Sequence, residues 1–277
     1  MKKVLLTLAV CLSFIGFAQA QLSEGETFKS TIVTGNRPEA GDWGLYLGPS
    51  FMEVRDLVNT MVSGGVAYGM PLINLKYYAT DNLEIRGGIQ YNGRTEKLSG
   101  DYDQEYWNGE DEIIKTIPVT DNYSYRRFRF SPGVAYHFSP KNILDVYVGG
   151  SIPLGVDAQE SVYESERYLL EGDRLIKVDN IDNASYTSFV AGLSCFIGLQ
   201  AFVADLPLAI GFEYGLTGMM RTGDEVYHVQ TDYEGNLQKF YTTTGSFYDT
   251  HYNKLDCKSK YMGSDVRLTI TYFFNNK

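Results

Sequence analysis

Eight stretches of the chain alternate apolar and polar residues with a period of two, which indicates strands whose two faces meet different environments. The last stretch shows this most plainly, because Val266, Leu268 and Ile270 share one face while Arg267 and Thr269 share the other. The pattern predicts strands at 43–52, 66–79, 83–93, 124–138, 143–154, 185–202, 206–217 and 262–274.

The connections between these strands differ in length in a regular way. The tight ones are 80–82, 139–142 and 203–205, and the long ones are 53–65, 94–123, 155–184 and 218–261. Short periplasmic turns and long extracellular loops are typical of outer-membrane barrels, which have an even number of strands in bacteria. The predicted fold class is therefore all-β, an antiparallel eight-stranded transmembrane β-barrel.

The N-terminus has the three parts of a secretory leader. Lys2 and Lys3 are its charged region, residues 4–17 are its apolar run, and Ala18-Gln19-Ala20 is its cleavage site. The apolar run is too short to cross a bilayer, so we expect a cleaved leader rather than an anchor. The predicted organisation is a signal peptide at 1–20, a short periplasmic segment at 21–42 and a barrel at 43–277.

Two other folds compete with the membrane barrel. The uncharged segment 183–204 is long enough for a transmembrane helix, but Phe189, Ala191 and Leu193 recur with a strand's period of two. A soluble β-sandwich or lipocalin-like barrel would turn the apolar faces inward instead. In a membrane barrel, by contrast, these apolar residues face outward: Val146, Val148, Ile210, Phe212, Leu268 and Ile270.

Charge on the polar faces favours the membrane barrel. The interior would then hold five cations and four anions, namely Lys76, Glu84, Arg86, Arg127, Arg129, Asp145, Glu213, Asp265 and Arg267. Side chains fill an eight-stranded barrel, so charges inside it must pair. We predict a blocked interior with Arg127 and Arg129 at its centre. Their expected partners are Glu84, Asp145, Glu213 and Asp265.

The acidic residues are concentrated in the long connections. The formal net charge is −10, and without Lys2 and Lys3 there remain 22 cations against 34 anions, a net charge of −12. All of this net charge falls in the four long connections. Acidic loops of this kind argue against nucleic acid as a partner.

At this point the chain resembles the small outer-membrane β-barrel family that includes OmpA's membrane domain, OmpX and OmpW. The resemblance is carried by the leader, the eight strands and the closing segment 265–274, which is similar to the C-terminal signal of the barrel-assembly machinery. Asn275-Asn276-Lys277 depart from the family's terminal Phe. The resemblance implies a Gram-negative outer-membrane location, a monomer, and contact with membrane lipids, lipopolysaccharide and the assembly machinery.

The chain offers few residues for chemistry. His137-Phe138-Ser139 is similar to the His-x-Ser element of the outer-membrane lipid A deacylase, but it enters a predicted periplasmic turn while lipid A lies in the outer leaflet. Four carboxylates match ligand positions of a calcium-binding loop: Asp101, Asp103, Glu105 and Glu112. Tyr106 stands where that loop needs Gly, so they form at most a weak cation site. We predict no catalytic residue and no cofactor.

Two hairpin signals lie inside the long connections, around Asp232–Asn236 and around Glu171–Asp173. They predict strands that continue beyond the membrane and could bind an extracellular protein. The favoured function is a non-enzymatic surface barrel that displays acidic, Tyr-rich loops for envelope integrity, adhesion or host contact. A small-solute channel, porin-like, is the alternative, and a lipid A-modifying barrel enzyme is the weaker one.

Overall fold

The computed structural model describes residues 37–62, 70–107, 112–138, 144–171, 174–203, 206–243 and 250–274. These residues belong to one compact unit, Thr34–Lys277. The predicted leader at 1–20 lies outside the described residues, as do most of the predicted periplasmic segment and the tight connection 139–142.

Eleven strands and one helix make up the described part of the chain. The strands are β1 (Trp43–Gly48), β2 (Leu72–Tyr78), β3 (Leu83–Trp107), β4 (Glu112–His137), β5 (Leu144–Ser151), β6 (Leu154–Glu171), β7 (Arg174–Phe202), β8 (Leu208–Thr222), β9 (Glu225–Thr231), β10 (Leu237–Thr243) and β11 (Lys258–Phe274). The helix is α2 (Phe51–Val62).

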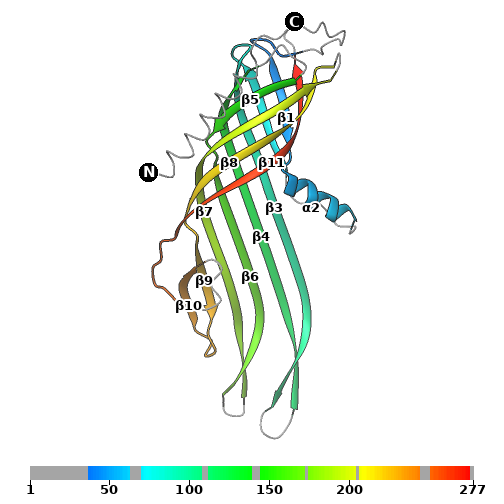
Figure 1. Ribbon diagram of the computed structural model, residues 1–277. Helices are drawn as coiled ribbons and strands as arrows, with labels where there is room; N and C mark the ends of the chain where they lie inside the picture. Colours follow the sequence, from blue (N-terminus) through cyan, green and yellow to red (C-terminus); the bar gives the residue numbers. More distant parts are fainter. Residues whose placement is uncertain are drawn as a thin grey trace, which may run out of the picture. The chain divides into compact units, whose positions relative to one another are not determined.

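The strands form a single antiparallel sheet whose hydrogen-bonded ladders close into a ring (Figure 1). The ring runs through β1, β2, β3, β4, β5, β7, β8 and β11, and β11 pairs back with β1. In the closing register Trp43 lies opposite Phe274 and Leu47 lies opposite Ile270. The predicted all-β class and antiparallel pairing are therefore confirmed.

The strand count differs from the eight predicted, because β6, β9 and β10 lie in segments predicted as long loops. β3 and β4 also extend into the predicted loop 94–123 and remain paired as far as Trp107 opposite Glu112. Alternation of apolar residues indicates a strand with one apolar face. Hydrogen bonding between strands, by contrast, needs only backbone groups and leaves no such pattern. The extension of β3 is largely polar on both faces, so the apolar pattern did not predict it.

A short break separates β5 from β6, although both pair with β4. Ile152 and Pro153 form this break, and Pro153 has no N–H to donate to a ladder. The chain resumes pairing at once, with Leu154 opposite Phe130. β6 therefore continues the line of β5 toward the far end of β4.

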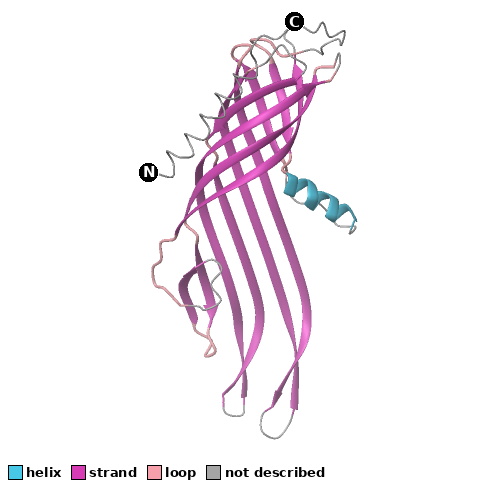
Figure 2. Ribbon diagram, viewed as in Figure 1, coloured by secondary structure: helices cyan, strands magenta, loops and turns pink. Residues whose placement is uncertain are grey.

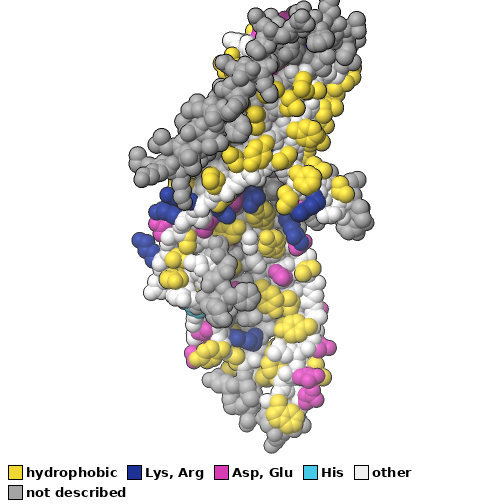
Figure 3. Space-filling model, viewed as in Figure 1, with side chains coloured by type: hydrophobic (Ala, Val, Ile, Leu, Met, Phe, Trp, Pro, Cys, Tyr) yellow, Lys and Arg dark blue, Asp and Glu magenta, His cyan; other side chains and the backbone are white. Residues whose placement is uncertain are grey.

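Burial alternates along the strands of the ring, which gives each strand an inner and an outer row of side chains. On β1, Tyr46 is buried while Leu45 and Leu47 are exposed. The outer row contains the six apolar residues predicted to face outward, of which Ile210, Phe212 and Ile270 are exposed and Val146, Val148 and Leu268 are half-buried. Figure 3 shows hydrophobic side chains gathered where β1, β8 and β11 lie, with Lys and Arg side chains below them.

Helix α2 occupies residues predicted as the end of a strand and the start of a loop. Ser50 and Glu53 form a capping box: the Ser50 N–H donates to Glu53 Oε2 at 2.6 Å and the Glu53 N–H donates to Ser50 Oγ at 3.2 Å. Figure 2 shows α2 leaving the side of the sheet. No helix among the described residues is long and apolar enough to cross a membrane, and the uncharged segment 183–202 lies in β7.

The hairpin predicted around Asp232–Asn236 is confirmed as the β9–β10 turn. Asp232 Oδ1 accepts the N–H groups of Glu234 at 2.9 Å and Asn236 at 2.8 Å, and its Oδ2 accepts from Gln238 Nε2 at 3.1 Å. Gly235 takes a φ of 91° in this turn. The bond from the Asn236 N–H and the other donors lower the pKa of Asp232, because they stabilise the ionised carboxylate.

We expect the β9–β10 turn to loosen in acid. A carboxylate with a lowered pKa contributes stability above its usual value of 3.8, and loses it as the pH falls through the lowered folded value. Amide hydrogen exchange at Glu234 and Asn236 should therefore accelerate in that window. The variant Asp232→Asn should remove the pH dependence, and unchanged wild-type protection on acidification would contradict the assignment.

Candidate functional site

The inner row of the ring contains most of the charged residues predicted to lie there. Lys76, Glu84, Arg86, Arg129, Asp145 and Glu213 are buried. β3 and β8 are not paired with each other, yet Arg86 of β3 and Glu213 of β8 are in contact. Such contacts across the ring place these side chains in its interior.

Arg86 is the centre of this interior network. Its Nε donates to Glu84 Oε1 at 2.5 Å and its Nη1 donates to Glu213 Oε1 at 2.6 Å. Lys76 Nζ lies 3.2 Å from Glu84 Oε2 and 4.7 Å from the centre of the Tyr46 ring. Two cations therefore hold two buried carboxylates, and their charges balance.

Two buried tyrosines complete the coordination of Glu213. The hydroxyl of Tyr46 donates to Glu213 Oε2 at 2.7 Å, and the hydroxyl of Tyr147 donates to Glu213 Oε1 at 3.0 Å. Tyr147 packs over Gly198, where a Cβ would lie 2.1 Å from its ring. These tyrosines were missed, although their place in the inner row follows from the period of two.

His137 lies in the same network, between two carboxylates. Its Nδ1 is 2.6 Å from Asp145 Oδ2 and its Nε2 is 3.2 Å from Glu84 Oε2. Gln200 Nε2 also donates to Asp145 Oδ2, at 3.0 Å. Ser139 of the proposed His-x-Ser element lies outside the described residues. Both ring nitrogens face carboxylates, which suits a structural histidine.

The predicted role of Arg127 and Arg129 is wrong. Arg129 Nη1 lies 2.6 Å from Asp157 Oδ1, and Arg127 Nε lies 3.3 Å from the same oxygen. Asp157 also contacts Arg221, at 3.3 Å. Asp157 was missed because it follows the break at Pro153, where the predicted strand ended. The alternation of Leu154, Val156 and Ala158 was the signal that could have found it.

Asp265 and Arg267 were predicted as separate members of the interior set, with Asp265 as a partner of Arg127 or Arg129. Instead they bind each other on β11, with side chains 29% and 30% exposed. They lie two residues apart on one face of the strand. Arg267 lies opposite Glu213 in the β8–β11 ladder, so this pair adjoins the central network.

Apolar side chains fill the ring beyond the network, near the connections β2–β3 and β7–β8. Tyr78, Phe202, Ala209 and Phe273 form a buried cluster. The ring centres of Phe202 and Phe273 are 5.9 Å apart, and those of Tyr78 and Phe273 are 6.0 Å apart. The interior is therefore occupied from this cluster up to the level of Arg86.

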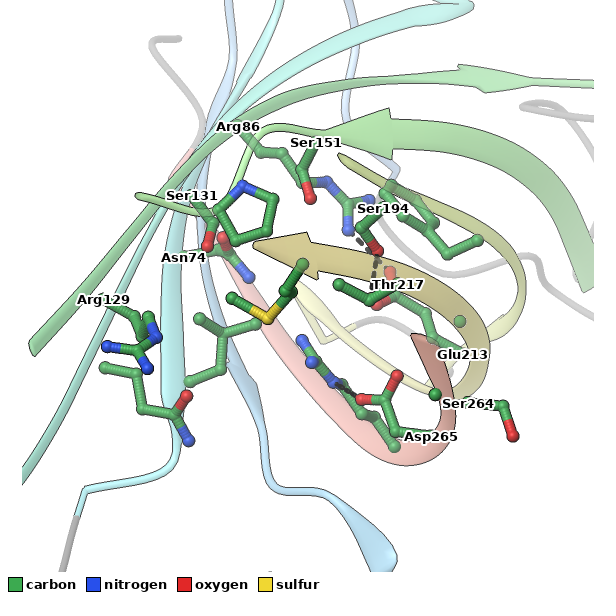
Figure 4. Close-up of a pocket in the computed structure, with 18 of the residues that line it drawn as sticks. Asn74, Arg86, Arg129, Ser131, Ser151, Ser194, Glu213, Thr217, Ser264 and Asp265 are labelled. Carbon is green, nitrogen blue, oxygen red and sulfur yellow. Dashed lines mark hydrogen bonds and ion pairs between the residues drawn. The ribbon is translucent and has the colours of Figure 1, made fainter. Parts of the chain in front are cut away.

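A pocket lies on the other side of the network (Figure 4). Its volume is about 340 Å³, and Arg86 and Glu213 are among the residues of its wall. The wall also includes the hydroxyl side chains of Ser131, Ser151, Ser194, Thr217 and Ser264, and the apolar side chains of Leu72, Phe196 and Met219. Thr217 donates a hydrogen bond to Ser194 Oγ at 2.8 Å.

The carboxylates considered for calcium lie on an extended hairpin. Asp101, Asp103 and Glu105 alternate along β3, and Glu112 begins β4. Asp103 accepts a hydrogen bond from Thr116 at 2.7 Å. Within the described residues, no group of three or more His, Cys, Asp or Glu side chains could hold a metal ion.

Comparison with known proteins adds no identification. No family model, curated protein or solved structure matches the chain. The outer-membrane resemblance stated from the sequence therefore remains a proposal.

We expect Arg86→Met to destabilise the protein strongly. The change leaves Glu84 and Glu213 buried without their main cation, a loss of roughly 3–5 kcal/mol for a buried pair. The matched control is Arg94→Met, because Arg94 pairs with Glu96 on the exposed part of β3 and such pairs contribute about 0–1 kcal/mol. Denaturant unfolding followed by circular dichroism measures both variants, and equal losses would contradict the central role of Arg86.

Proposed function

We propose that the chain is an outer-membrane protein of Gram-negative type, whose ring of strands is an eight-stranded transmembrane β-barrel. Its role in this proposal is non-enzymatic: it displays stiff acidic hairpins at the cell surface. The proposal rests on one observation: the ring reverses the distribution of charged and apolar side chains that is usual in a soluble protein. Ionised side chains are buried inside, and large apolar side chains are exposed outside.

The outer row of the ring has no explanation in a soluble monomer. Leu45 lies opposite Leu75 in the β1–β2 ladder, and both are exposed, at 45% and 49%. Ile85, Ile89 and other apolar residues of the same row are also exposed. Contiguous apolar surface of this extent marks an interaction site. A lipid bilayer is the partner that surrounds a ring on every side.

The interior supports a closed barrel more than a channel. The network around Arg86 and the cluster around Phe273 fill successive levels of the ring. Eight-stranded barrels have interiors that side chains can fill, unlike the wide aqueous pores of larger barrels. The small-solute channel is therefore the second candidate, and the lipid A-modifying enzyme is less supported because both nitrogens of His137 face carboxylates.

The long hairpins support the display function. A strand needs about 9–11 residues to cross the bilayer, whereas β3 has 25 residues and β4 has 26. The remaining residues of β3 would extend about 50 Å beyond the membrane at roughly 3.3 Å per residue. β6 and β7 form a second hairpin of this kind, and β9 pairs with β7 beside it.

The free edge of β3 is the surface we propose for an extracellular protein partner. The β2–β3 ladder ends at Ile73 opposite Ile89, and the Met70 N–H still bonds to the Tyr91 carbonyl. Beyond Tyr91, β3 pairs with β4 and with no second strand among the described residues. An unpaired strand edge can accept a strand of a partner. Its charged side chains limit indiscriminate pairing.

The membrane proposal predicts different outcomes for two arginine substitutions at exposed apolar positions. Phe212 of β8 is 58% exposed and Leu98 of the β3 extension is 67% exposed. In water both changes should cost little. In a bilayer Phe212→Arg should cost about 2–4 kcal/mol near the midplane, while Leu98→Arg, outside the membrane, should cost about zero. Folding titrations into lipid vesicles measure both, and equal small effects would contradict the lipid-facing assignment.

The closed interior predicts low conductance. Purified protein added to a planar lipid bilayer should give no large, stable open channel, because buried ion pairs and aromatic rings block the ring. The protein is delivered by fusing protein-containing vesicles with the bilayer, and recovery of folded protein from a sample of those vesicles verifies that it was incorporated. A large and stable conductance would favour the channel instead.

A further inference from the structure

Helix α2 exposes apolar side chains along one face. Phe51, Val54 and Val58 follow one another at intervals of three and four residues, which places them on the same side of a helix. Phe51 is 67% exposed and Val58 is 52% exposed, while Val54 is half-buried. Asp56 is exposed on the opposite side, because successive residues lie about 100° apart around a helix. A helix of this kind normally buries its apolar face against a partner.

The start of α2 is bonded to two strands of the ring. β1 and β2 lie between β3 and β11 in the order of the strands. The Leu268 N–H of β11 donates to the Pro49 carbonyl at 3.1 Å, and Gln90 Nε2 of β3 donates to Glu53 Oε1 at 2.5 Å. Figure 1 shows α2 projecting outward from the side of the sheet. The helix therefore begins at a fixed level of the wall.

This level is the border of the apolar outer row of β3. Every second residue of the strand belongs to this row, in the order Leu83, Ile85, Gly87, Ile89, Tyr91, Gly93, Thr95 and Lys97. Large apolar or aromatic side chains end at Tyr91, the neighbour of the residue that binds Glu53. The segment 83–91 is nine residues long, close to the roughly 9–11 residues with which a strand crosses a bilayer.

Aromatic residues mark the same border. Tyr91 lies opposite Phe128 in the β3–β4 ladder, and both side chains are 46% exposed. In membrane barrels, girdles of aromatic residues flank the apolar band at the two interfaces with water. A bilayer that covered the outer row of β3 would therefore have its interface at the level where α2 begins.

We propose that α2 lies in the headgroup interface of the bilayer, with Phe51, Val54 and Val58 directed toward the acyl chains. Helices with separated apolar and polar faces bind there with the apolar face about 5–10 Å deep. Because its start is bonded to both β3 and β11, α2 fixes the depth at which the ring sits in the membrane. This inference rests on the proposed membrane barrel and names the lipid interface as the partner of one further element.

The test measures how brominated lipid quenches single tryptophans. The chain has two tryptophans, Trp43 and Trp107, and both are replaced by Phe before one new tryptophan is introduced. Val58→Trp places it on the apolar face of α2, and the matched control Asp56→Trp places it on the opposite side. The full chain is refolded into phosphatidylcholine vesicles, either unbrominated or brominated near the headgroup end of one acyl chain.

We expect bromination to lower the fluorescence of Val58→Trp at least about twofold and to change that of Asp56→Trp much less, because an interfacial helix turns one face to the acyl chains. Circular dichroism verifies folding. Phe51→Trp, on the same face, replaces Val58→Trp if that variant does not fold. Equal quenching on the two sides of α2 would overturn the interfacial assignment.

A further variant separates this inference from the membrane proposal. Trp107→Phe leaves Trp43 as the single tryptophan, and Trp43 lies in the outer row of β1 with 40% of its surface exposed. If Trp43 is quenched but Val58→Trp is not, the assignment of α2 is wrong and the membrane barrel stands. If Trp43 is not quenched, the membrane proposal fails and the assignment of α2 fails with it.

Discussion

A closed ring with apolar side chains outside must neutralise whatever charge it encloses. Arg86 contributes to this neutralisation, because its guanidinium pairs with both Glu84 and Glu213. The pair with Glu213 also joins β3 to β8 across the interior. Lys76, Tyr46 and Tyr147 then satisfy the remaining carboxylate oxygens. The position of the pocket follows as well, since the network forms its floor. Without this balance the inner row would carry unpaired charge in a confined space.

The two halves of β3 have different physical surroundings. From Leu83 to Ile89 its side chains alternate between exposed and mostly buried positions, and it has a paired strand on each side. From Tyr91 onward most of its side chains are exposed, and β4 is its partner. A single ladder thus passes from a packed ring into a two-sided ribbon without a break. This continuity lets one rigid element serve both as wall and as projection.

Most strands of the ring could be predicted from the sequence, because apolar residues alternate along one face of each. The inner positions of Glu84, Arg86 and Glu213 follow from alternation. The extension of β3 did not, because its residues are largely polar on both faces. The extension of β4 carries Ile113 and Ile117 on one face, and Ile117 is buried, so its signal was overlooked. The ion-pair partners of the inner residues could not be predicted either. Arg129 was correctly assigned to an inner row, but its contact with Asp157 depends on the register between β4 and β6. Helix α2 was missed because its capping box, Ser50 with Glu53, adjoins a strand-like run.

The ladder between β1 and β11 has a consequence for the order of folding. Its paired residues, such as Trp43 and Phe274, stand at opposite ends of the described chain, whereas the β3–β4 and β6–β7 hairpins join neighbours in sequence. Local hairpins form quickly, and contacts between distant residues must first overcome loop-closure entropy. We therefore expect the hairpins to form early and the ring to close last. Until closure, β1 and β11 each present an unpaired edge, and this interval is when the chain is most exposed to pairing with the wrong strand.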